Sequence, residues 1–162
     1  MFDVGYGSER RENRIREIAA TDKTTAVILA AVHFEWMLKR TILKLGISPT
    51  KALRAQFQHV YSPLDTPGKD NYKKIWDREI RKRFKKAALG KVLGGWNKVK
   101  SHAWKKVRNR VIHGNGTVSN KDADEAIELF LDAGGKLRDF VKNCDKKESL
   151  DTRLRARLKP RA

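Results

Sequence analysis

Cysteine is almost absent from this sequence, since Cys144 is the one thiol among 162 residues. A single thiol cannot form a disulfide within the chain, and no Cys/His cluster has the spacing of a structural zinc site. Disulfides are typical of oxidising compartments. We therefore expect a reducing, cytoplasmic compartment.

Long apolar stretches are missing as well. No run of about 18 apolar residues occurs, so we expect no membrane-spanning helix. Residues 1–16 lack the apolar core of a secretory signal peptide. Two of the four prolines, with Gly68, fall within residues 61–68, where we expect a loop that is mobile or contacts a partner.

Several catalytic patterns are also absent. The glycines near residue 90 lack the Lys-Ser/Thr ending of a Walker phosphate loop. The sequence has no paired carboxylates, no metal-ligand constellation and no serine nucleophile beside a histidine. We therefore expect neither a bound metal nor a cofactor.

Negative charge is scarce. The 37 Lys and Arg residues outnumber the 19 Asp and Glu residues, which gives a net charge of +18 and a pI near 10.3. Sixteen of the basic residues lie between Lys69 and Arg110, against three acidic ones. A run of Lys and Arg is often only a solvated face, but an excess this uneven predicts a polyanionic partner. An anionic membrane surface fits the charge but not the scattered aromatic residues, so we expect nucleic acid rather than membrane.

Apolar periodicity predicts an all-α bundle of about five helices. The predicted helices cover residues 24–45, 50–60, 71–89, 96–113 and 120–143, with a shorter one that begins at Ser8 as N-cap. The first of these is apolar on nearly all sides, which indicates a central helix. We expect a loose arm over residues 1–8, a helical domain over 9–145 and a basic tail over 146–162 that is flexible until it meets nucleic acid.

The helix that ends at His113 carries the most informative residues. Trp104, Val107 and Val111 recur at three- and four-residue spacing and predict the buried side. His102, Lys106, Asn109 and His113 fall on the opposite side, and Gly114 follows as a left-handed C-cap. A histidine in a last turn is also common as a simple contact with the helix dipole, so the spacing alone leaves both interpretations open.

The run from Arg108 to His113 resembles the signature of the HEPN superfamily (higher eukaryotes and prokaryotes nucleotide-binding domains). That signature is an arginine, a polar residue directly after it and a histidine a few positions later, near the end of the fourth helix of an all-α bundle. Arg108, Asn109 and His113 match it one by one, and the resemblance extends over roughly residues 10–145. It implies a HEPN-like fold and a metal-independent endoribonuclease of the toxin or antiviral-defence type.

The resemblance assigns roles to particular residues. Arg108 would bind the phosphate, Asn109 would orient the phosphate or the imidazole, and His113 would act as base or acid. Arg110 is an alternative to Arg108, and Glu35 is a weaker supporting candidate. The residues expected to bind RNA are His102, Lys105, Lys106 and Arg110. Asn115 occupies the position where one HEPN subgroup has a modified tyrosine, so that regulation is not expected here.

Active HEPN proteins are homodimers that bring two motifs together, so the resemblance also implies a two-fold dimer through the motif helices. The products would be 2′,3′-cyclic phosphate and 5′-hydroxyl ends, and an antitoxin or inhibitor protein would be a further partner. The alternative that the residues leave open is a non-catalytic nucleic-acid-binding module in which the motif only binds phosphate.

Overall fold

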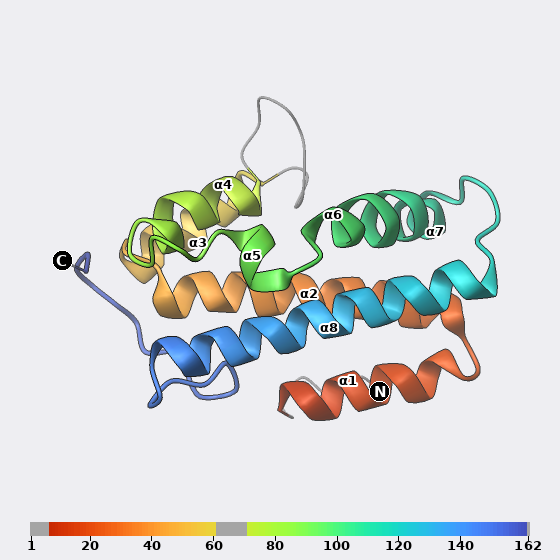
Figure 1. The fold of residues 1–162 in the computed structure, drawn as a ribbon, viewed down its shortest axis with the longest axis horizontal. Helices are drawn as coiled ribbons and strands as arrows, with labels where there is room; N and C mark the ends of the chain where they lie inside the picture. The colour runs from red at the N-terminus through yellow and green to blue at the C-terminus, as the bar shows by residue number, and fades with distance from the viewer. Residues whose placement is uncertain (1–6, 61–70, 162) are drawn as a thin grey trace. The chain divides into compact units, whose positions relative to one another are not determined.

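The computed structural model describes residues 7–60 and 71–161, and every regular element within them is a helix (Figure 1). The prediction of an all-α helical bundle is thereby confirmed. Most of the expected N-terminal arm (1–8) and the expected loop at residues 61–68 lie outside the described residues. None of the helices in the described ranges has the length and apolar character needed to cross a bilayer.

The chain divides into two compact units, and both long helices contribute to both units. Unit 1 consists of Met1–Trp36 and Gly95–Lys136, and unit 2 of Met37–Gly94 and Leu137–Ala162. Helix α2 (Lys23–Leu45) passes from unit 1 to unit 2 after Trp36, and α8 (Asn120–Cys144) does so after Lys136.

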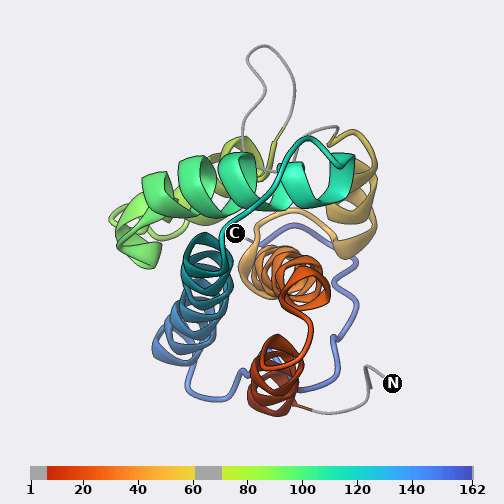
Figure 2. The same cartoon turned by 90° about the vertical axis from the view of Figure 1, so that its right-hand side faces the viewer.

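Unit 1 is built from four helical segments. They are α1 (Ser8–Ala19), the first part of α2, the first part of α8, and a rod made of α6 (Trp96–Lys98), η2 (Val99–Arg108) and α7 (Asn109–His113). We call this rod, residues 96–113, the motif helix. Figure 2 shows α2 next to both α1 and α8, with the motif helix lying across α2 and α8. Phe130 packs at the centre of the unit 1 core. The ring centroids of Phe34 and Trp104 lie 5.8 and 6.1 Å from the Phe130 centroid.

The middle of the motif helix is a π-helix rather than the α-helix that the apolar spacing predicted. Val99–Arg108 has π geometry, in which each N–H bonds five residues back. Val99, Ala103, Trp104 and Val107 are buried as expected, while Val111 is half-buried. Periodicity could not distinguish the two forms because both place these apolar residues on one side.

The ends of the helices in unit 1 follow local signals closely. Gly114 has φ 64° and caps the motif helix in the left-handed conformation, as predicted. Ser119 accepts a 3.1 Å hydrogen bond from the Asp122 N–H and caps α8. Ser8 is not the cap of α1, since Gly7 holds that position and Ser8 is a buried residue of the first turn.

Unit 2 contains shorter helices. These are α3 (Thr50–Gln58), α4 (Tyr72–Trp76), the π-helix η1 (Asp77–Arg81) and α5 (Leu89–Leu93), together with the remaining parts of α2 and α8. The helix expected over 71–89 ends at Arg81 because the chain turns back, and the Trp76 Nε1–H donates to the Ala87 carbonyl at 2.7 Å. A tertiary contact of this kind leaves no periodic signal in the sequence.

A buried carboxylate connects α2, α3 and η1. Glu79 is 4% exposed and accepts hydrogen bonds from the Ile47 and Ser48 N–H groups at 2.9 and 2.8 Å and from the Ser48 hydroxyl at 2.7 Å. Burial raises the pKa of Glu79, but these bonds outweigh it, so the pKa lies below its ordinary value. The ionised form of Glu79 therefore stabilises the α2–α3 turn.

The segment after α8 differs from the flexible tail that its composition predicted. The Arg157 N–H donates to the Thr50 hydroxyl at 2.9 Å, and the Arg157 Nε–H donates to the Ser48 carbonyl at 3.0 Å. The Arg161 N–H donates to the Ile47 carbonyl at 2.9 Å. Composition indicated solvated charge here, but the guanidinium of Arg157 instead satisfies carbonyls at the end of α2 and in the turn after it.

Candidate functional site

Arg108 lies where the π-helix passes into α7, and two neighbours hold its guanidinium in place. The guanidinium carbon is 4.4 Å from the centroid of the Trp104 ring, and Nη1 donates to the Asn109 Oδ1 at 3.0 Å. Burial lowers the pKa of Arg108, and the negative charge of Glu35 on α2 opposes that shift. Arginine remains charged in any protein environment. The result is a half-buried cation with fixed orientation.

Asn109 and Glu35 thus both act on Arg108. Asn109 is half-buried and accepts the Arg108 hydrogen bond, so it orients the guanidinium in this structure rather than the imidazole of His113. Glu35 is half-buried in α2 and contributes an electrostatic interaction with Arg108. Glu35 was expected only as a weak supporting residue, and its charge acts on the motif arginine, Arg108.

His113 is the last residue of α7 and is exposed. Within the described ranges, no residue forms a hydrogen bond or ion pair with its imidazole. The five-residue step from Arg108 to His113 runs through regular α-helix, which separates the two side chains by about 140° around the axis. One chain therefore presents an exposed imidazole and an oriented guanidinium on different sides of one helix end.

The four residues expected to bind RNA fall into two pairs. Lys105 and Arg110 are exposed on the motif helix. Lys106 instead donates to the Asp122 Oδ1 at 3.0 Å, and His102 faces two carboxylates of α8. Arg110 is thus better placed to meet a phosphate than His102 and Lys106.

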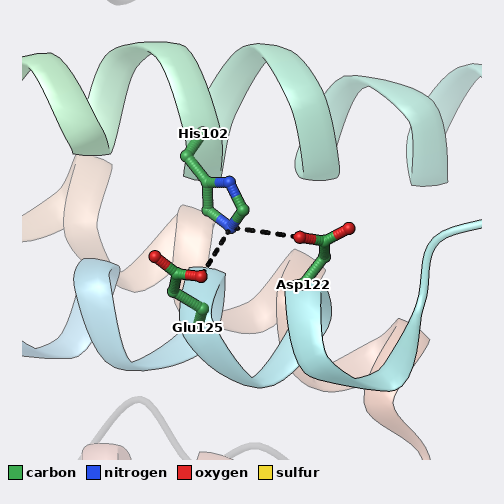
Figure 3. A group of neighbouring side chains, drawn as sticks. All are labelled: His102, Asp122 and Glu125. Atoms are coloured by element: carbon green, nitrogen blue, oxygen red, sulfur yellow. Dashed lines mark ion pairs between the residues drawn. The ribbon is translucent and has the colours of Figure 1, made fainter.

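The His102 cluster, which consists of His102, Asp122 and Glu125, is a feature that sequence reasoning missed (Figure 3). The His102 Nε2 lies 3.9 Å from the Asp122 Oδ1 and 3.6 Å from the Glu125 Oε2. The sequence signal was the acidic pair three residues apart in the first turns of α8, which places both carboxylates on one side. Nothing in the sequence, however, indicated that His102 packs against that side.

Three acidic residues in the first part of α8 pair with basic residues of unit 1. The hydrogen bond from Lys106 lowers the pKa of Asp122 most, and Ser119 and His102 contribute to the shift. Glu128 receives two hydrogen bonds from Arg16 at 3.1 Å, and Asp124 pairs with Lys23. These three acids are thus paired with cations of the same unit.

The geometry combines a fixed cation with a free imidazole. Because an aromatic ring and an amide already restrict this guanidinium, little side-chain conformational entropy is lost when an anion binds to it. An exposed imidazole is accessible to a bound ligand and can accept or donate a proton there. These are two of the groups that general acid–base chemistry at a phosphate needs.

The chain matches no protein-family model, and no characterised protein or solved structure matches it significantly. The likeness to the HEPN superfamily is therefore carried by Arg108, Asn109, His113 and their helical setting alone.

Proposed function

We propose that this protein is a HEPN-type endoribonuclease that cleaves RNA without a metal ion in the reaction. The observation that carries the proposal is the Arg108–Asn109 pair, oriented by Trp104, one turn before an exposed His113 at the capped end of the same helix. The resemblance of this run to the HEPN signature supports the same conclusion.

The chemistry follows from RNA itself. The ribose 2′-hydroxyl attacks the adjacent phosphorus, the P–O5′ bond breaks, and the products are a 2′,3′-cyclic phosphate and a 5′-hydroxyl. His113 accepts the 2′-hydroxyl proton or donates a proton to the departing O5′. Arg108 stabilises the additional negative charge on the phosphoryl oxygens in the transition state. No redox partner or activated water is required.

One chain supplies one of the two proton-transfer groups, so the proposal includes a homodimer. Ile112, which precedes the catalytic histidine, is 43% exposed and is one of the large exposed apolar side chains of the described residues. The dimer is what the HEPN resemblance implies, and an interface at this end of the motif helix would cover Ile112. Two motif helices that meet there bring one chain's His113 towards the other chain's Arg108, which the α-helical step prevents within one chain.

RNA binding relies on charge rather than base recognition. The net charge of +18 favours a polyanion, and Lys105 and Arg110 lie exposed beside the motif. By resemblance, the cellular role is that of a cytoplasmic toxin or antiviral effector, and a protein antitoxin or inhibitor holds the activity in check. Expression of the free protein would then arrest growth.

The test compares wild type with His113→Ala on end-labelled RNA in excess EDTA. His59→Ala is a matched control, because His59 is an exposed histidine outside the motif. We expect wild type and His59→Ala to cut and His113→Ala to be inactive, with fragments that carry 2′,3′-cyclic phosphate. Binding by fluorescence anisotropy should change little for any of the three.

A different outcome would favour the non-catalytic alternative. If no variant cuts any RNA while all bind with a steep dependence on salt, the protein is a nucleic-acid-binding module and the motif only contacts phosphate. If His113→Ala cuts as fast as wild type, the activity belongs to another site or to a contaminant.

A further inference from the structure

The His102 cluster contains a buried ring nitrogen that makes no hydrogen bond. The His102 Nε2 is inaccessible to solvent and is among the buried side-chain atoms of the described residues that lack a hydrogen-bond partner. It points between the carboxylates of Asp122 and Glu125 (Figure 3). A buried polar atom without a hydrogen-bond partner destabilises the fold, so a ligand that contacts this nitrogen would offset that cost.

The distances exceed those of hydrogen bonds but approach those between ligands of one metal ion. Hydrogen bonds to oxygen span roughly 2.7–3.2 Å, whereas the His102 Nε2 lies 3.6 and 3.9 Å from the two oxygens. Ligand atoms about 2.0–2.1 Å from a tetrahedral zinc lie about 3.3–3.4 Å from one another. The three ligand atoms here all fall within 4.8 Å of each other, so small side-chain rotations bring them onto one ion.

We propose that His102, Asp122 and Glu125 bind a divalent first-row transition metal, with Zn²⁺ as the reference ion. An imidazole nitrogen with two carboxylate oxygens is a donor set that such ions accept. The Asp122 and Glu125 ligands come from α8 and the His102 ligand from η2, so the bound ion cross-links the two helices. The remaining coordination positions are filled by water.

Lys106 is the competitor at this site. Its ammonium donates to the Asp122 Oδ1 at 3.0 Å, the oxygen that also faces His102. The Lys106 side chain is 46% exposed, so it can move into solvent when an ion takes its place. Removal of this cation should therefore strengthen metal binding, an effect that a plain ion-pair network does not predict.

The metal site is independent of the cleavage motif. Neither Arg108 nor His113 belongs to the cluster, and the proposed reaction uses no metal. Failure of metal binding therefore leaves the nuclease proposal intact, and an inactive motif leaves the metal site intact. The ion would act by stabilising the packing of η2 on α8.

The experiment titrates metal-free full-length protein with ZnCl₂ by isothermal calorimetry and measures thermal unfolding with and without excess zinc. We expect one equivalent of zinc to bind and to raise Tm by about 5 °C at saturation. Co²⁺ should give the intense visible absorption of a low-symmetry site with nitrogen and oxygen ligands. His102→Ala, Asp122→Asn and Glu125→Gln should each weaken zinc binding more than about tenfold, and Lys106→Gln should strengthen it.

Glu128→Gln and His113→Ala are the matched controls, since Glu128 is an acid of the same helix and His113 an exposed histidine of the motif helix. Both should bind zinc like wild type. Circular dichroism of each variant shows that a loss of binding is not a loss of fold. The proposal is overturned if wild type binds no zinc, or if the three ligand variants bind as well as the controls.

Discussion

The guanidinium of Arg108 lies over the ring of Trp104, with 4.4 Å between the guanidinium carbon and the ring centroid. Trp104 is 4% exposed and belongs to the core of unit 1, so a core residue determines where the motif cation lies. Asn109 completes the arrangement from the next position in the chain. The packing of the core thus orients the guanidinium that the proposed reaction uses.

Arg108→Lys should lower RNA cleavage by about two to three orders of magnitude while the fold remains intact. Lysine keeps the charge but loses the planar stack on Trp104 and the donor to Asn109, so the cation is no longer oriented. Single-turnover cleavage rates test this, with circular dichroism as the check on folding. Arg110→Lys is the control and should retain most activity. The reverse ranking would assign the functional role to Arg110.

Arg110→Ala should weaken RNA binding and lower the slope of log K against log salt by about one. Arg110 is exposed, whereas Lys106 is hydrogen-bonded to Asp122 and therefore contributes less to phosphate binding. Lys106→Ala should therefore change the slope less. Anisotropy titrations over a range of salt concentrations measure both slopes. Equal slopes for the two variants would show that Lys106 contacts phosphate as much as Arg110 does.

Gly114→Ala should destabilise the protein by about 1 kcal/mol, which is a fall in Tm of about 2–4 °C. Gly114 adopts φ 64°, which side chains rarely accept, while a Cβ there would meet no atom within 4 Å. The cost is therefore one of backbone conformation and not of crowding. Gly114→Asn should cost less, because asparagine tolerates this region better. Thermal melts of the two variants measure these changes in Tm. An unchanged Tm for Gly114→Ala would argue against the left-handed cap.

Glu79→Gln should reduce the free energy of unfolding at pH 7 by about 1–3 kcal/mol, since charge-assisted bonds to the α2–α3 turn are lost. The folded-state pKa of Glu79 lies below its unfolded value of about 4.3. The stabilisation is therefore fully present above that pH and disappears as the pH falls through the folded-state value. Denaturant unfolding from pH 7 to pH 3 should show wild type and variant converging. A difference that stays constant over this range would contradict the assignment.

Arg157→Ala should destabilise the protein by about 1–3 kcal/mol, because the Ser48 carbonyl loses its guanidinium donors. Arg155→Ala, two residues earlier and exposed, should be neutral within about 0.5 kcal/mol. Urea unfolding of both variants separates a docked segment from a free basic tail. Equal stability of the two variants would support the flexible tail expected from composition.

The parts of the fold that were predictable are those with local causes. The central helix was expected over residues 24–45 and α2 is Lys23–Leu45, because its apolar residues and the glycine after it are contiguous signals. The same holds for the Gly114 cap. Each needs only a few neighbouring residues to determine its conformation.

The parts that were not predictable depend on contacts between distant residues. The helix that ends at Arg81 is followed by a turn that brings the Ala87 carbonyl to the Trp76 ring nitrogen. The Arg157 segment docks on residues more than 100 positions earlier in the chain. His102 was assigned to RNA because its helix face was known but its neighbours on α8 were not. Composition predicted the excess of positive charge and could not say which cations are already paired.

The most direct measurement of the central claim uses an RNA whose cleavage position has been mapped and the same strand with a single 2′-deoxyribose at that position. If the 2′-hydroxyl is the nucleophile, wild type in excess EDTA binds both strands equally but cuts only the first, and His113→Ala cuts neither. Cleavage of the 2′-deoxy strand at the same bond would contradict the account, because the attacking group would then have to be water or a protein side chain.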